Sequence, residues 1–144
     1  MNIEKEIGKL KYQIKLLKCM VNGDEFPFFM YAIDHEFEEN QVNALLKILT
    51  AFRYRMYEGT DDNYHHYHEL NKADAQLQSL LIIYQIETSE IYKHELPSII
   101  EFRHYLNCIF AEKETNPKHI LLSLKRQSIY KELCDYLLNQ IEDL

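Results

Sequence analysis

The chain has 144 residues, and its 16 Lys and Arg against 23 Asp and Glu give it a formal net charge of −7 at pH 7. This acidic balance disfavours unaided binding to nucleic acid or anionic lipid, because affinity for both comes largely from basic side chains that meet phosphates. Hydrophobic residues make up 47% of the chain and charged residues 27%, which is typical of a packed globular protein. We therefore expect one domain over residues 1–144, with no nucleic-acid partner and no membrane partner.

The numbers of glycine, proline and cysteine residues indicate the fold class and the cellular compartment. Three glycines and three prolines supply few turns for a sheet of many strands, so an all-α fold is expected. Cys19, Cys108 and Cys134 are odd in number and widely spaced, which predicts neither a disulfide framework nor a thiolate metal site. With no signal-peptide pattern and no run long enough for a membrane span, we expect a cytoplasmic protein.

The first expected helix, residues 3–21, has a heptad pattern. Its apolar seam comprises Ile3, Ile7, Leu10, Ile14, Leu17 and Val21. The seam has β-branched residues at one set of positions and leucines at the other. This distribution favours a parallel coiled coil of two helices. Glu6 lies five residues before Lys11, the spacing at which opposite charges meet across a parallel pair. We therefore predict a homodimer whose interface contains Ile7, Leu10, Ile14, Leu17 and Val21.

A second apolar stripe lies on the other side of this helix, formed by Tyr12, Leu16, Cys19 and Met20. A helix with two apolar faces is expected to be buried from two directions. Three heptads are too few to decide whether both stripes pack within one chain or one of them packs between two chains. Both arrangements stay open at this point.

Two further helices are expected before residue 60. Pro27 opens a short helix to about His35, because proline fits the first helical turn, and its high apolar content predicts a plug over the core. The next helix begins near Glu38 and ends near Glu58. Its predicted buried face comprises Val42, Leu45, Leu49, Phe52 and Met56, followed by Gly59 as a C-cap.

The middle of the chain is unusually rich in tyrosine and histidine. Leucine spacing from Leu70 onward predicts a long helix that continues to about Lys93, with a break near Asn71 left open. Tyrosine contributes apolar area while its hydroxyl stays wet, so Tyr64 and Tyr67 are predicted to bind a protein partner; the alternative is that they are half-buried at the edge of the core.

Three helices complete the expected bundle. One begins at Pro97, with Ile99, Ile100, Tyr105, Leu106, Ile109 and Phe110 as its predicted buried side. The next should have Asn116 as N-cap and Pro117 as its first residue, with Ile120, Leu121 and Leu124 inward. The last is expected over residues 129–142 after Ser128 as cap, with Leu133, Leu137, Leu138 and Ile141 inward. The whole is predicted to be a compact helical bundle of about six to seven helices.

Two groups of side chains contain residue types that bind metals. His65, His66 and His68 stand close together, and imidazole suits zinc, nickel and copper, but a solvated histidine-rich face is the simpler interpretation. Glu101 and His104 form a single Glu-x-x-His, which di-iron bundles use twice. The prediction is therefore no metal and no cofactor.

Both ends of the chain resemble a known family. The opening stretch, residues 3–48, contains Leu10-Lys11-Tyr12, Phe26-Pro27-Phe28 and Ile33-Asp34, and the closing stretch contains Asn116-Pro117 and Gln127-Ser128-Ile129-Tyr130. Together, over about two-thirds of the chain, they resemble the small helical YhaI-like proteins of Bacillus and relatives. The resemblance implies an all-helical domain of unknown function with no catalytic residues. The chain departs from that family at residues 60–96.

We expect a non-enzymatic protein that acts by binding other proteins. No Gly-rich phosphate loop, HExxH or GxSxG motif is present. Two alternatives remain. One is a small inhibitor or regulator from a mobile element, with acidic surface against a basic target. The other is a metal-dependent enzyme or sensor that uses the histidine cluster.

Overall fold

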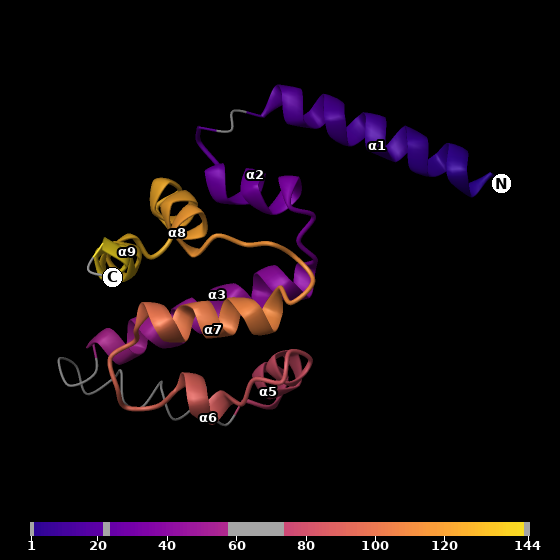
Figure 1. Ribbon diagram of the computed structural model, residues 1–144. Helices are drawn as coiled ribbons and strands as arrows, with labels where there is room; N and C mark the ends of the chain where they lie inside the picture. Colours follow the sequence, from indigo (N-terminus) through magenta and orange to yellow (C-terminus); the bar gives the residue numbers. More distant parts are fainter. Residues whose placement is uncertain (1, 22–23, 58–73, 143–144) are drawn as a thin grey trace.

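The computed structural model describes residues 2–21, 24–57 and 74–142, and within these ranges it contains eight helices and no strand (Figure 1). The helices are α1 (Ile3–Met20), α2 (Pro27–Asp34), α3 (Glu39–Tyr57), α5 (Ala75–Ile82), α6 (Thr88–Ile91), α7 (Ile99–Ile109), α8 (Pro117–Arg126) and α9 (Lys131–Glu142). The predicted all-α class is confirmed. None of the described helices is long and apolar enough to cross a lipid bilayer.

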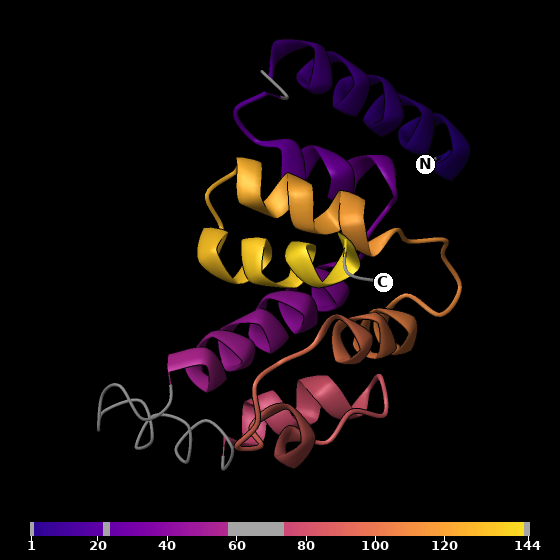
Figure 2. The ribbon, with the colours of Figure 1, turned by 60° about the vertical axis from the view of Figure 1, so that its left-hand side comes forward.

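The core is built around α3. This helix contacts α5, α6, α7 and α9, and its residues Leu45, Ile48, Leu49 and Phe52 are almost completely buried. Figures 1 and 2 show α3 and α7 side by side, with the α8–α9 pair on one side of them and α5 and α6 on the other. α2 packs on α8 at the far end of the bundle. The chain thus forms layers of helices in which α3 is central.

Several sequence-predicted helix ends are confirmed. Asn116 Oδ1 accepts hydrogen bonds from the backbone N–H groups of Lys118 at 2.9 Å and His119 at 3.3 Å, and Pro117 is the first helical residue. The cap satisfies donors that have no partner inside the helix. α1, α2 and α3 each end within about one residue of the predicted position.

The long helix predicted to continue to Lys93 is wrong within the described residues. Asp74 Oδ1 caps α5 by accepting from the Gln76 and Leu77 N–H groups, and Gln85 has a φ of 60°, which ends the helix. The turn at Gln85 lets both Leu81 and Ile91 reach the core, with relative exposures of 0%. The break between α5 and α6 raises the number of helices above the predicted six to seven.

Two smaller predictions are also wrong. Ile100 was expected on the buried side of α7, but 68% of its surface is exposed, because that helix buries only one stripe against α3 and α9. The last helix begins at Lys131 and not at residue 129. Ser128 and Tyr130 have φ values of 61° and 47°, in the left-handed region, so the helix cannot extend through them.

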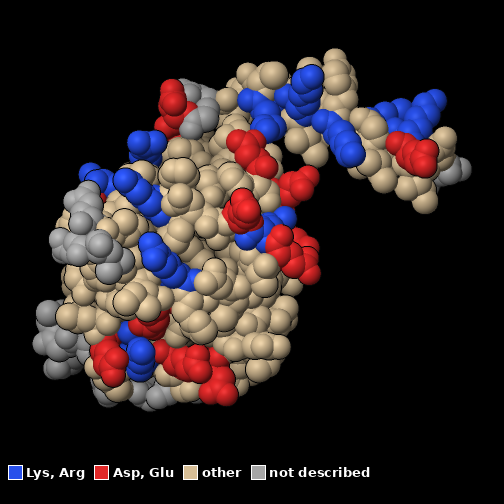
Figure 3. All heavy atoms as spheres, viewed as in Figure 1, with Lys and Arg blue, Asp and Glu red and all other residues tan. Residues whose placement is uncertain are grey.

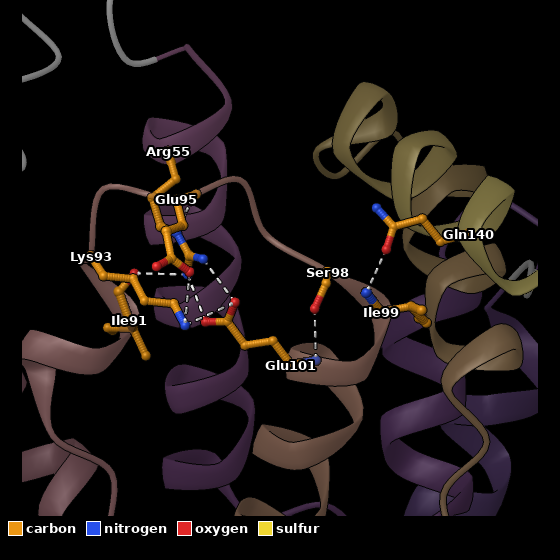
Figure 4. Close-up of polar contacts among 8 residues, drawn as sticks. All are labelled: Arg55, Ile91, Lys93, Glu95, Ser98, Ile99, Glu101 and Gln140. Carbon is orange, nitrogen blue, oxygen red and sulfur yellow. Dashed lines mark hydrogen bonds and ion pairs between the residues drawn. The ribbon is translucent and has the colours of Figure 1, made fainter.

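Two glutamines join helices that are distant in sequence. Gln127, which follows α8, accepts from the Phe28 and Phe29 N–H groups at 2.9 and 3.1 Å and so caps the N-terminus of α2. Gln140 of α9 accepts from the Ile99 N–H at 2.7 Å at the start of α7 (Figure 4). Each bond satisfies an N-terminal helix donor from another helix.

A charged group lies in the core between α3, α7 and the segment after α6. The side chain of Arg55 is 0% exposed, and its guanidinium donates two hydrogen bonds of 2.7 Å to the two carboxylate oxygens of Glu101 (Figure 4). It also donates to the Glu95 carbonyl at 2.7 Å and the Ile91 carbonyl at 3.3 Å. This bidentate pair therefore anchors an irregular segment to two helices.

Arg55→Met should lower the free energy of unfolding by about 3 kcal/mol, because it leaves the Glu101 carboxylate in a largely buried site without its main partner. The measurement is urea unfolding followed by circular dichroism. Arg53→Met, on the same helix but exposed, is the matched control and should change stability by less than about 1 kcal/mol. Equal losses for the two variants would contradict the anchoring role.

Candidate interaction surface

α1 lies outside the core of its own chain. None of its residues is buried, and Figure 3 shows it as an arm that extends past the rest of the molecule. The expectation that it is buried from two directions is therefore wrong for a single chain, because among the described helices only α2 lies next to it (Figures 1 and 2). The helix is nonetheless well formed. Asn2 Oδ1 accepts from the Lys5 N–H at 3.2 Å, with Glu4 and Glu6 in the first turn.

The heptad seam is exposed along its full length. The relative exposures of the five predicted interface residues are 45% for Ile7, 57% for Leu10, 50% for Ile14, 57% for Leu17 and 45% for Val21. The second stripe is equally open, with Tyr12 at 61% and Met20 at 79%. A soluble chain rarely leaves an apolar surface of this extent uncovered unless something binds to it.

The C-terminal half of the seam forms one wall of an apolar groove of about 540 Å³. This α1–α2 groove is lined by Ile14, Leu17, Lys18 and Val21 from α1 and its end, and by Phe26, Phe29, Met30 and Ile33 from α2 and the residue before it. The rings of Phe26 and Phe29 lie parallel, with centroids 6.1 Å apart. Lys18 is the single charged residue in the lining, and its ammonium lies 2.5 Å from the Asp34 carboxylate at the end of α2.

Charge is divided between α1 and the segment that follows it. α1 contains five lysines and two glutamates, a net charge of +3, whereas residues 24–39 contain six acidic residues and no lysine or arginine. These six acidic residues, Asp24, Glu25, Asp34, Glu36, Glu38 and Glu39, are all exposed. A basic helix therefore lies beside an acidic segment, and the apolar groove runs between them.

The outer face of α2 was not predicted from the sequence as a contact surface. α2 was expected to plug the core, but only Phe28 is buried, while Phe29 and Ile33 are 49% and 48% exposed. An eight-residue helix with this many apolar residues has more than one apolar face. That excess was the signal in the sequence for a second contact surface.

The other candidate sites fall into two groups. Tyr64, Tyr67, His65, His66 and His68 lie outside the described residues. The Glu-x-x-His pair is described: both Glu101 carboxylate oxygens accept from Arg55, and His104 Nε2 lies 3.8 Å from Cys108 Sγ. Within the described ranges, no group of three or more His, Cys, Asp or Glu side chains is placed to hold a metal ion.

The three cysteines differ in environment. Cys19 on α1 is exposed, and Cys108 is of intermediate exposure. Cys134 is 0% exposed, and its thiol donates to the Ile129 carbonyl at 3.5 Å. Burial raises the pKa of the Cys134 thiol to about 12 and also raises that of Cys108. Only a thiolate reacts readily with alkylating reagents, so the reactivities should separate.

At pH 8, iodoacetamide should label Cys19 at least about 100-fold faster than Cys134, because a thiol with a pKa near 12 is almost fully protonated there and is shielded as well. Peptide mass spectrometry at successive times gives the two rates. Labelling in 8 M urea, where both thiols are open, is the control. Similar rates in the folded protein would contradict the buried position of Cys134.

Comparison with known proteins adds a family but no chemistry. No curated protein and no solved structure matches the chain. A family model described as "Protein of unknown function (DUF1878)" matches residues 1–96, which include α1, α2 and the central helix α3. This match spans well over half of the chain, so the chain belongs to the DUF1878 family of proteins of unknown function.

Proposed function

We propose that this protein acts without catalysis, by binding other proteins, and that it forms a homodimer through α1. The observation that carries the proposal is a heptad-spaced apolar helix with no buried residue in its own chain. Exposed apolar residues are concentrated in α1 and α2. Of the sixteen large hydrophobic residues that are exposed among the described residues, twelve lie in residues 3–33. A contiguous apolar surface of this kind marks a protein-binding site.

The seam favours a parallel pair. Ile7, Ile14 and Val21 would occupy one set of core positions, with Leu10 and Leu17 at the other, the pattern typical of parallel dimers. Parallel pairing also brings Glu6 of each copy toward Lys11 of the other. An antiparallel pair would instead place the two Lys11 side chains near each other, which like-charge repulsion disfavours.

The environment of the ionisable groups supports a role without catalysis. Burial raises the pKa values of the Tyr92 and Tyr105 hydroxyls, as it does for Cys134, and all three side chains are packed in the core. The proposal includes no cofactor. It also includes no nucleic acid, since a chain with a net charge of −7 disfavours contact with phosphates. The three free cysteines suit a reducing compartment such as the cytoplasm.

The proposal includes a relationship to the YhaI-like proteins of Bacillus and relatives. The matched residues 1–96 include the opening stretch that carries this resemblance and end before the closing one. A further protein partner is also part of the proposal, with Tyr64 and Tyr67 as its anchors. Aromatic side chains of this kind contribute much of the binding energy at interfaces.

Ile14→Glu should convert the protein from a dimer to a monomer at tens of micromolar, a concentration at which a standard interface stays assembled. Its fold should be retained, because Ile14 is half exposed in the single chain. Light scattering after gel filtration gives the mass, and circular dichroism checks the fold. An unmodified protein that is monomeric at this concentration would remove the homodimer from the proposal.

Tyr64→Ala combined with Tyr67→Ala should remove most of the protein partner captured from the native host, while Tyr64→Phe combined with Tyr67→Phe, which keeps both rings, should retain it. Quantitative mass spectrometry compares the captured proteins, and the circular dichroism of both variants should match that of the unmodified protein. Equal capture by both variants would show that these tyrosines are not the anchors.

A further inference from the structure

The α1 seam is too short to make a stable dimer alone. It extends only from Ile3 to Val21 and supplies six apolar residues, whereas a lone coiled coil usually needs at least roughly three to four heptads. Standard interfaces use about 20–30 residues from each partner. Pairing through α1 therefore requires a second surface that adds contact area beside the seam.

The α1–α2 groove is in the right place to supply that surface. Ile14, Leu17 and Val21 belong both to the seam and to the groove, so a helix lying on the seam also lies over the groove. The opposite wall presents Phe29 and Ile33, each about half exposed. A helix seated there covers apolar surface of α1 and α2 together.

Charge favours the α1 of a second copy as the occupant. Bare pairing of two α1 helices brings together two net charges of +3, which repel each other. The groove is bordered by the acidic segment 24–39, which has six carboxylates and no lysine or arginine. Within one chain, Lys18 already contacts Asp34 at 2.5 Å, so lysines on α1 can reach this segment. The apolar stripe of a second α1 matches the apolar lining of the groove, and the lysines beside that stripe match the acidic segment 24–39.

We propose that the α1–α2 groove receives the α1 helix of a second copy of this chain, so that the dimer interface includes the outer face of α2. The inference rests on the proposed homodimer and specifies its surface. In a two-fold symmetric pair, α1 of each copy lies in the groove of the other, and the two α1–α2 pairs form one four-helix cluster. Phe29 and Ile33 are then interface residues although they lie outside the heptad.

Ile33→Ser and Ile100→Ser make a matched pair, because both remove an exposed isoleucine side chain from a helix, the first on α2 and the second on α7. Ile33→Ser should raise the dimer dissociation constant at least about tenfold, since it removes apolar area that the proposed dimer buries. Ile100→Ser should leave the constant unchanged within about twofold. Analytical ultracentrifugation over a concentration series measures both, and thermal unfolding followed by circular dichroism checks that each variant is folded.

Two further variants make the test decisive. Phe29→Ser removes a different side chain from the same wall and should weaken the dimer like Ile33→Ser. Leu10→Glu changes the seam outside the groove and should give monomers. If Leu10→Glu gives monomers while both α2 variants dimerise like the unmodified protein, the groove inference is wrong and the homodimer through α1 stands. If Leu10→Glu leaves the dimer intact, the proposed self-association through α1 is itself wrong.

Discussion

Burial of α3 is the constraint on which the rest of the fold depends. Of the described helices, α5, α6, α7 and α9 all contact it, and its central residues have almost no exposed surface. A helix enclosed in this way cannot leave a charged side chain unpaired, so Arg55 on its inner face requires the Glu101 carboxylate and the backbone carbonyls of Ile91 and Glu95. Packing around α3 thus also determines the path of the irregular segment between α6 and α7.

Polar contacts define how the outer helices dock on this core. Gln127, just after α8, caps the N-terminus of α2 from 99 residues away in sequence, and Gln140 of α9 caps that of α7 from 41 residues away. Such caps are directional and satisfy donors that would otherwise lose their hydrogen bonds on burial. The Gln127 cap holds α2 with Phe28 inward, and this orientation turns Phe29 and Ile33 outward into the α1–α2 groove. The position of the candidate surface therefore follows from the way the core is assembled.

The contrast between α1 and the other helices carries the functional argument. Helices α3, α7, α8 and the short α5 and α6 bury apolar residues within the chain, whereas α1 buries none. α1 is also basic in a chain that is acidic overall, and the segment after it, residues 24–39, contains six acidic residues and no lysine or arginine. The apolar pattern and the charge pattern of the N-terminal region together are the basis for proposing that a partner binds there.

Local signals in the sequence determined the helical class, the Asn116-Pro117 helix start and the heptad pattern of residues 3–21, because capping and apolar periodicity act between residues a few positions apart. Tertiary structure decided the rest. Periodicity identifies an apolar face but not the surface that covers it, so it could not show that α1 lies outside its own core or that Ile100 is exposed. Periodicity also did not predict the left-handed conformation of Gln85, which separates α5 from α6, or the groove between α1 and α2. Both depend on contacts between segments that are separate in the sequence.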